Sequence, residues 1–213
     1  MTKKGCGRLA LVACASVAAV GLLPGASAVA KTKTKTATFN QCVSTASAIT
    51  DEKSGFASVF VPVPKNGKKI QAGTVTAVNS VGTRITHTYS GDLFLTLVSP
   101  AGKATALVVE RGQEFDGYGT GPANCSGSLV QFSDGFGTPA SGIVNPGPGN
   151  DNTPISGSFS PEQPLSGFLG GPARGFWTLV VTDCCDVDQG SLDALSLNLT
   201  YTYKVPVKKK GGK

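Results

Sequence analysis

The sequence predicts an all-β protein whose strands form a sandwich of two sheets. Apolar residues recur at every second position in several segments, as in Leu195, Leu197 and Leu199, and this period places them on one face of a strand. Turn residues rich in Gly and Pro separate these segments. After residue 30 no stretch of the sequence has a sustained helical period.

The expected strands are separated by segments rich in turn residues. In one of them Leu93, Leu95 and Leu97 share one face, with Phe94 and Thr96 on the other. The segments with this pattern are 59–63, 74–89, 93–98, 104–110, 177–182 and 195–203. Residues 117–174 are dense in Gly and Pro, and we expect short strands and ordered turns there, because long structureless loops are uncommon in compact domains.

The first 30 residues have the order of a secretory signal peptide. A positive start is followed by an apolar run over 9–23 and by small residues at 26–30. We therefore expect a secreted, extracellular protein with no membrane span in the mature chain. A bacterial lipoprotein acceptor at Cys14 is the alternative, and it would leave an apolar region shorter than signal peptides have.

The mature chain of about 180 residues suits one domain. We expect a Lys/Thr-rich leader at 31–48, a sandwich at 49–203 and a basic tail at 204–213. Residues 37–203 carry eight basic and all thirteen acidic residues, a net charge of −5. This charge excludes a nucleic-acid-binding face, which needs clustered basic residues. The basic ends are either solvated or able to hold acidic polymers of a cell surface.

Four cysteines remain after removal of the signal peptide: Cys42, Cys125, Cys184 and Cys185. An even number in an exported chain predicts disulfides. A bridge between the adjacent Cys184 and Cys185 would be strained, since adjacent Cα atoms lie ~3.8 Å apart and unstrained bridges need ~4.4–6.8 Å. We therefore expect one of them to pair with Cys42 and the other with Cys125, in either order. Metal binding by the four thiolates is the alternative, but the usual ligand spacing is missing.

Two long motifs resemble the P/Homo B domain that follows the protease domain in subtilisin/kexin-type proprotein convertases. The first is the hairpin sequence at 85–102, with His87, Gly91 and Asp92; the second runs through 161–168, 175–183 and 190–192, with Trp177. Ile49-Thr50-Asp51 is similar to the opening of the same domain. The resemblance spans 49–203 and implies a jelly-roll-like β-sandwich. The sequence departs from the family pattern in three places: Thr50, Leu195 and the pair Cys184-Cys185.

The sequence lacks the residues of a subtilisin-like catalytic triad, so we expect a protein that is not an enzyme. His87 is the only histidine, and it lies inside a strand pattern. The segment nearest to a subtilase serine motif, 137–140, has no serine. A general base needs a nucleophile and an orienting acid, so we assign His87 a structural, hydrogen-bonding role. A serine-type endopeptidase label would describe the proteins with which such domains occur.

The clustered carboxylates Asp183, Asp186 and Asp188 are candidate calcium ligands, because calcium prefers hard oxygen ligands from a flexible loop. Turn formation by the same aspartates is the alternative, and the expected cofactor is therefore none or calcium. Trp177 is in phase with Leu179 and is expected in the core, whereas Phe176 points to the other face.

The resemblance implies a free-standing, non-catalytic module that docks on or stabilises a separately encoded exported protease. A cell-envelope or glycan-binding sandwich is the alternative. Protease docking needs an exposed apolar patch on one sandwich face. Glycan binding needs exposed aromatic side chains beside carboxylates or amides.

Overall fold

The computed structural model describes residues 30–51, 53–122, 126–144 and 153–207. The expected signal peptide (except Ala30), Cys14, Cys125 and most of the basic tail lie outside these residues. The regular secondary structure of the described chain is β-strands and three short 3-10 turns, so the all-β prediction is confirmed. No helix in this part of the chain is both long and apolar enough to cross a membrane.

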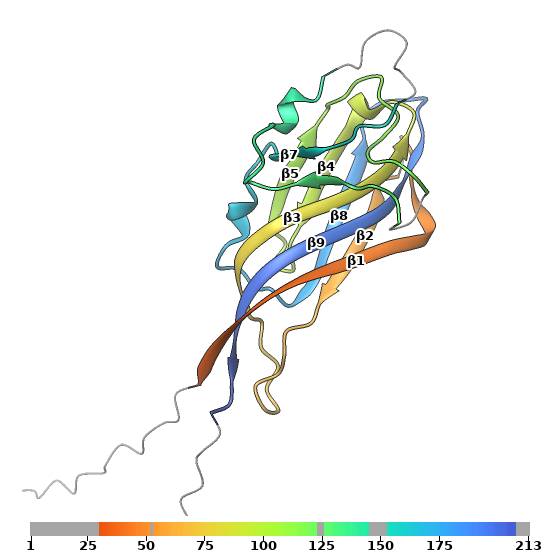
Figure 1. The fold of residues 1–213 in the computed structure, drawn as a ribbon. Coiled ribbons are helices and arrows are strands. Elements are labelled where there is room, and N and C mark those ends of the chain that lie inside the picture. The colour runs from red at the N-terminus through yellow and green to blue at the C-terminus, as the bar shows by residue number, and fades with distance from the viewer. Residues whose placement is uncertain (1–29, 52, 123–125, 145–152, 208–213) are drawn as a thin grey trace, which may run out of the picture.

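The strands form two sheets with a jelly-roll order (Figure 1). The five-stranded sheet contains, in spatial order, β1 (Lys31–Ile49), β9 (Gly190–Val205), β3 (Thr74–His87), β6 (Val130–Phe132) and β7 (Ser158–Phe159). The four-stranded sheet contains β2 (Gly55–Val61), β8 (Gly175–Asp183), β4 (Leu93–Val98) and β5 (Ala104–Val109). β1 pairs with β9, β2 with β8, β3 with β6 and β4 with β5. Each pair is thus nested inside the one before it in the chain, as in two-sheet jelly rolls.

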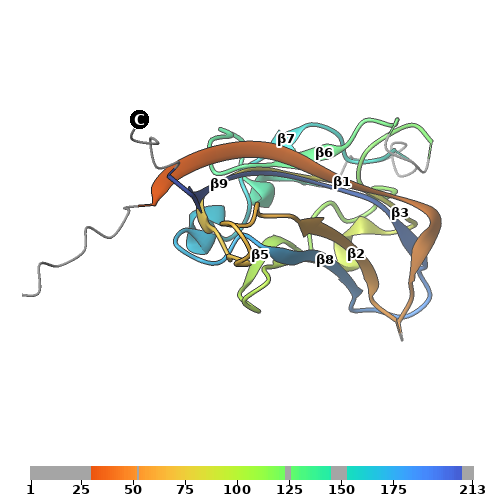
Figure 2. The same cartoon turned by 90° about the horizontal axis from the view of Figure 1, so that it is seen from below.

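The hydrophobic core lies between the two sheets, which Figure 2 shows as two stacked layers. The inward positions of the central strands alternate with outward ones, as the period of two predicts. Fully buried residues include Leu93, Leu95, Leu97, Trp177, Leu179, Val181, Leu195, Leu197, Leu199 and Tyr201. The strongest apolar alternations in the sequence therefore form the facing surfaces of the sandwich.

The expected leader is a strand of the sheet, which corrects the predicted start of the sandwich at residue 49. Strand β1 pairs antiparallel with β9 from Lys31 opposite Val205 to Ile49 opposite Gly190. Threonine favours strands, and the hydroxyls of Thr36 and Thr200 lie 2.8 Å apart across the pair. β1 is an edge strand, and its exposed lysines suit an edge that does not pair further.

The region dense in Gly and Pro contains ordered short elements, as predicted. They are β6, η2 (Ala140–Gly142), β7 and η3 (Leu165–Phe168). Tyr118 is fully buried, and its backbone exchanges hydrogen bonds of 2.8 and 2.9 Å with that of Ile85 on β3. This bridge joins the start of the region to the five-stranded sheet.

Candidate functional site

His87, at the end of β3, is buried and makes contacts with both ring nitrogens. Only 1% of its surface is exposed. Nδ1 lies 2.9 Å from the carbonyl oxygen of Tyr89, and Nε2 lies 3.1 Å from Oδ2 of Asp183 at the end of β8. The pair joins the two sheets at one end of the sandwich, because β3 and β8 belong to different sheets. The structure therefore gives His87 the hydrogen-bonding environment that we expected.

The other residues of the resembling motifs have structural positions close by or in the core. Gly91 lies in η1 (Ser90–Asp92), where an added Cβ would come within 2.7 Å of the Cα of Gln113. The carbonyl of Asp92 accepts the Cys184 amide at 3.0 Å. Trp177 is fully buried, and its Nε1 donates to the carbonyl of Ala173 at 3.1 Å. Close packing at Gly91 and burial with a hydrogen bond at Trp177 explain these two residue types.

The structure does not bring the three candidate calcium ligands together. Oδ1 of the buried Asp183 accepts the amide of Cys185 at 3.2 Å, and its other oxygen contacts His87. Asp188 accepts the Thr88 hydroxyl at 2.7 Å, and Asp186 is exposed. Asp183 and Asp188 therefore hydrogen-bond different partners.

A different set of metal-ligating side chains is gathered at this end of the sandwich. In the described part of the chain the ligand atoms of Asp92, Cys184 and Cys185 lie within 4.8 Å of one another. Two thiols and one carboxylate do not suit calcium, which prefers oxygen ligands. Calcium binding remains a prediction.

The expected pairing of Cys184 and Cys185 with distant cysteines is not what the structure has. Both are exposed free thiols, and their Sγ atoms lie 2.6 Å from each other. Cys42 is disulfide-bonded, so it is not available to either of them. The sequence shows the strain of an adjacent bridge, but not that the loop turns both side chains toward each other.

The outer face of the four-stranded sheet carries a cluster of exposed phenylalanines, which we call the aromatic face. Phe56, Phe60 and Phe176 have 54%, 41% and 62% of their surface exposed. Phe60 on β2 lies opposite Phe176 on β8, and their rings pack edge to face with centroids 5.2 Å apart. The guanidinium carbon of Arg174 lies 5.1 Å from the centroid of the Phe60 ring. One positive charge therefore borders the pair of exposed rings.

Neighbouring outward positions extend the aromatic face across three strands. These positions hold only apolar side chains and hydroxyls: Ser58, Thr178, Val180, Thr182, Phe94, Thr96 and Val98. Phe176 was expected to be exposed, and this is confirmed. Phe56 and Phe60 were missed, although both are out of phase with the buried Val59 and Val61 and could have been assigned outward on that ground.

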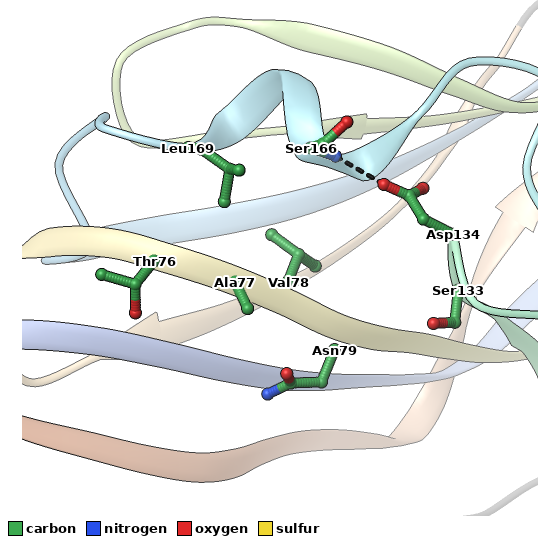
Figure 3. Close-up of a pocket in the computed structure, with 8 residues that line it drawn as sticks. All are labelled: Thr76, Ala77, Val78, Asn79, Ser133, Asp134, Ser166 and Leu169. Atoms are coloured by element: carbon green, nitrogen blue, oxygen red, sulfur yellow. Dashed lines mark hydrogen bonds between the residues drawn. The ribbon is translucent and has the colours of Figure 1, made fainter.

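A shallow groove of about 300 Å³ lies on the opposite sheet, between β3 and η3 (Figure 3). Ala77, Val78 and Leu169 provide its apolar lining, and Asn79 and Asp134 stand at its polar side. The two oxygens of Asp134 accept the amides of Leu165 and Ser166 at 2.7 and 2.8 Å. This carboxylate therefore holds the start of η3, where backbone N–H groups need acceptors, and is not free for a ligand.

Comparison with solved structures finds partial matches to larger proteins. A serine protease of Aeromonas sobria matches with a TM-score of 0.45 and 18% identity, covering 81% of this chain and 28% of the other. A structure of the Aeromonas sobria serine protease with its chaperone matches with a TM-score of 0.45 and 19% identity, covering 80% and 27%. This chain thus spans little more than a quarter of the length of each. No curated protein sequence matches the chain.

Comparison with protein families finds the proprotein convertase P-domain, whose model matches residues 77–134. The matched segment contains the whole of the motif at 85–102, from the end of β3 through the β4–β5 turn. The motifs from 161 to 192 lie outside it and remain a resemblance. The P/Homo B resemblance is therefore confirmed over residues 77–134, where this chain is similar to the proprotein convertase P-domain.

Proposed function

We propose that this chain is a secreted, non-catalytic P-domain module that docks through its aromatic face on a serine endopeptidase of the subtilisin/kexin type. The exposed cluster of Phe56, Phe60 and Phe176 is the observation on which the proposal depends. Exposed apolar patches on soluble proteins commonly mark sites of interaction. Covering these rings would remove apolar surface from water, which is the main favourable contribution to most protein association.

The chemistry of the aromatic face favours a protein partner over a glycan. Sugar binding combines aromatic stacking with hydrogen bonds from carboxylates or amides. The outward positions of β2, β4 and β8, which all lie in the described part of the chain, hold neither group. Interface centres are instead rich in aromatic residues and arginine, as at Phe60, Phe176 and Arg174.

The environment of His87 supports a non-catalytic role. It is the only histidine of the sequence, it is buried, and its ring contacts a backbone carbonyl and Asp183. A general base must reach the proton of a nucleophile. Neither of these two groups carries a hydroxyl or a thiol that could act as a nucleophile. The hydrogen bonds of His87 therefore fit a structural role.

Affinity capture tests the proposed docking. The purified protein is immobilised and exposed to culture supernatant of its source organism, and bound material is treated with a fluorophosphonate probe that labels active-site serines. We expect the protein to retain a labelled endopeptidase. The double variant Phe60→Ser/Phe176→Ser should lose at least about tenfold of it, since each aromatic anchor at an interface centre contributes roughly 2 kcal/mol or more.

A matched control places the same number of changes on the other sheet. Thr32 and Thr34 are exposed on the edge strand β1, and Thr32→Ala/Thr34→Ala should capture as much protease as the unchanged protein. Equal capture by the aromatic-face variant, with unchanged thermal unfolding, would contradict docking through this face. Activity of the captured protease after heating, with and without the protein, then measures stabilisation.

A cell-envelope or glycan-binding role is the second candidate, and the opposite sheet favours it. Asn198 donates to the Thr38 hydroxyl at 3.1 Å, and Asn79 donates to the carbonyl oxygen of the Asn198 side chain at 2.8 Å and to the Thr200 hydroxyl at 2.9 Å. These hydroxyls and amides form a polar row across β1, β9 and β3. Retention on washed cell walls that is lost in Asn79→Ala, but kept in the phenylalanine double variant, would support this role.

A further inference from the structure

Cys184 and Cys185 begin the loop from β8 to β9, and both side chains are exposed. Their Sγ atoms lie 2.6 Å apart, closer than two unbonded sulfurs normally approach and near the ~2.05 Å of a disulfide. We propose that Cys184 and Cys185 form a reversible redox site, which closes to a disulfide between the two neighbouring residues and opens again with thiols.

The backbone amides of both cysteines are held by hydrogen bonds. The amide of Cys184 donates to the carbonyl of Asp92 at 3.0 Å. The amide of Cys185 donates to the carboxylate of Asp183, which is itself buried against His87. Closure therefore needs a small movement of two sulfur atoms and no rearrangement of the sandwich.

The surroundings of the pair favour protonated thiols while it is open. A hydrogen bond with Cys185, burial and the nearby carboxylates of Asp92 and Glu110 together raise the pKa of Cys184 to about 12. Thiolate is the attacking form in disulfide exchange, so exchange that begins at Cys184 should become faster as the pH rises. Cys185 also hydrogen-bonds Asp92, which partly offsets the rise that burial causes in the pKa of that carboxyl. Closure removes this donor.

The oxidant that we propose is a low-molecular-weight disulfide. One cysteine thiolate attacks a sulfur of the oxidant, which forms a mixed disulfide and releases one thiol of the oxidant. The neighbouring cysteine then gives up its proton and attacks the protein sulfur of the mixed disulfide, which releases the second thiol. The two cysteines lose two electrons and two protons, and the oxidant disulfide is reduced to two thiols.

Strain makes the closed form easy to reduce. Adjacent Cα atoms lie ~3.8 Å apart, less than the ~4.4–6.8 Å of relaxed disulfides, and strained, exposed disulfides are the labile ones. A ring that contains no residue between the two cysteines also removes little chain entropy from the unfolded state. The bond is therefore suited to exchange with thiols and not to stabilising the fold.

Mass spectrometry after thiol exchange tests the proposal. The full chain is incubated with oxidised glutathione, its remaining thiols are alkylated, and it is digested with trypsin. Cleavage after Arg174 and Lys204 yields one peptide, residues 175–204, that contains only these two cysteines. We expect this peptide to be unalkylated and about 2 Da lighter than its dithiol form. Excess reduced glutathione should restore two alkylated cysteines.

Two single variants control for the mechanism. In Cys184→Ser and Cys185→Ser the remaining cysteine has no neighbour to resolve the mixed disulfide, so each should accumulate a glutathione adduct that the unchanged protein lacks. Thermal unfolding of the open and closed forms should differ by less than about 3 °C. A bond from either cysteine to Cys42 or Cys125, a disulfide-linked dimer, two thiols that resist oxidation or a larger thermal shift would overturn the proposal.

Discussion

Replacing Arg84 by methionine is expected to destabilise the fold strongly, because it leaves a buried carboxylate without its counter-charge. Arg84 on β3 donates through Nη1 to Oδ2 of Asp193 on β9, whose side chain is 1% exposed. The same carboxylate accepts the hydroxyls of Thr86 at 2.9 Å and Ser191 at 2.7 Å. Nη2 of Arg84 also donates to the carbonyl of Gly121 at 2.6 Å.

The size of the loss follows from burial. Removing one partner of a buried ion pair costs roughly 3–5 kcal/mol, because the remaining charge stays desolvated and unpaired. The pair between Arg111 and Glu162 is the internal comparison: its atoms lie 2.7 Å apart, but its side chains are 36% and 20% exposed. Breaking such a solvated pair with Arg111→Met should cost about 0.2–1 kcal/mol.

Urea unfolding of both variants measures the difference. At an unchanged slope m, the midpoint shift gives the change in the free energy of unfolding. Arg84→Met should lose several times more stability than Arg111→Met, and Arg84→Met/Asp193→Asn should recover much of the loss, since the buried charge is gone. Similar losses for the two single variants would refute the reasoning, because they would mean that Asp193 is solvated like a surface carboxylate.

Three further predictions concern single positions. Trp177→Ala should lower the free energy of unfolding by about 3–5 kcal/mol, because this ring is fully buried. The adjacent Phe176→Ala should lower it by no more than about 1 kcal/mol, because this ring is 62% exposed. Urea midpoints of the two variants measure the difference. Gly91→Ala should lower the unfolding temperature, since its Cβ would lie 2.7 Å from the backbone of Gln113. Burial raises the pKa of Asp92 above its ordinary value of 3.8, so its ionised form opposes folding at neutral pH. Asp92→Asn should therefore raise the urea midpoint slightly at pH 7, and this gain should vanish as the pH falls below 3.8, where the carboxyl is protonated in both states.

The sequence alone predicted the strands that line the core, because apolar residues that face the core alternate in them with residues that face outward. It did not predict β1, since 31–36 alternates lysine and threonine and contains no apolar residue. Every residue from Lys31 to Thr36 is exposed, so burial imposes no pattern there. Pairing with β9 is what makes this segment a strand, and such pairing leaves no apolar period in a single sequence.

The residues of the candidate sites are brought together by strand pairing, which the sequence does not show. Asp92 and Cys184 are far apart in the chain, and only the pairing of β4 with β8 brings their backbones to 3.0 Å. The period of two could have predicted that Phe56 and Phe60 face outward. That they lie on the same face as Phe176 depends on the register between β2 and β8. The sequence of one strand thus predicts which side chains share a face, but it does not predict which residues of two strands lie opposite each other.

The two outer faces of the sandwich differ in what a partner would gain by covering them. On the five-stranded sheet Thr36, Thr200, Asn198 and Asn79 already hydrogen-bond one another across the strands, so a partner would have to replace these bonds to bind. On the four-stranded sheet the exposed rings of Phe60 and Phe176 have no polar group to satisfy, and their burial carries no such cost. Arg174 lies against one edge of this patch and offers a charge that a partner can match. The favourable free energy of docking should therefore come mainly from the aromatic face. Substitutions there should weaken protein association more than an equal number of changes on the outer face of the five-stranded sheet.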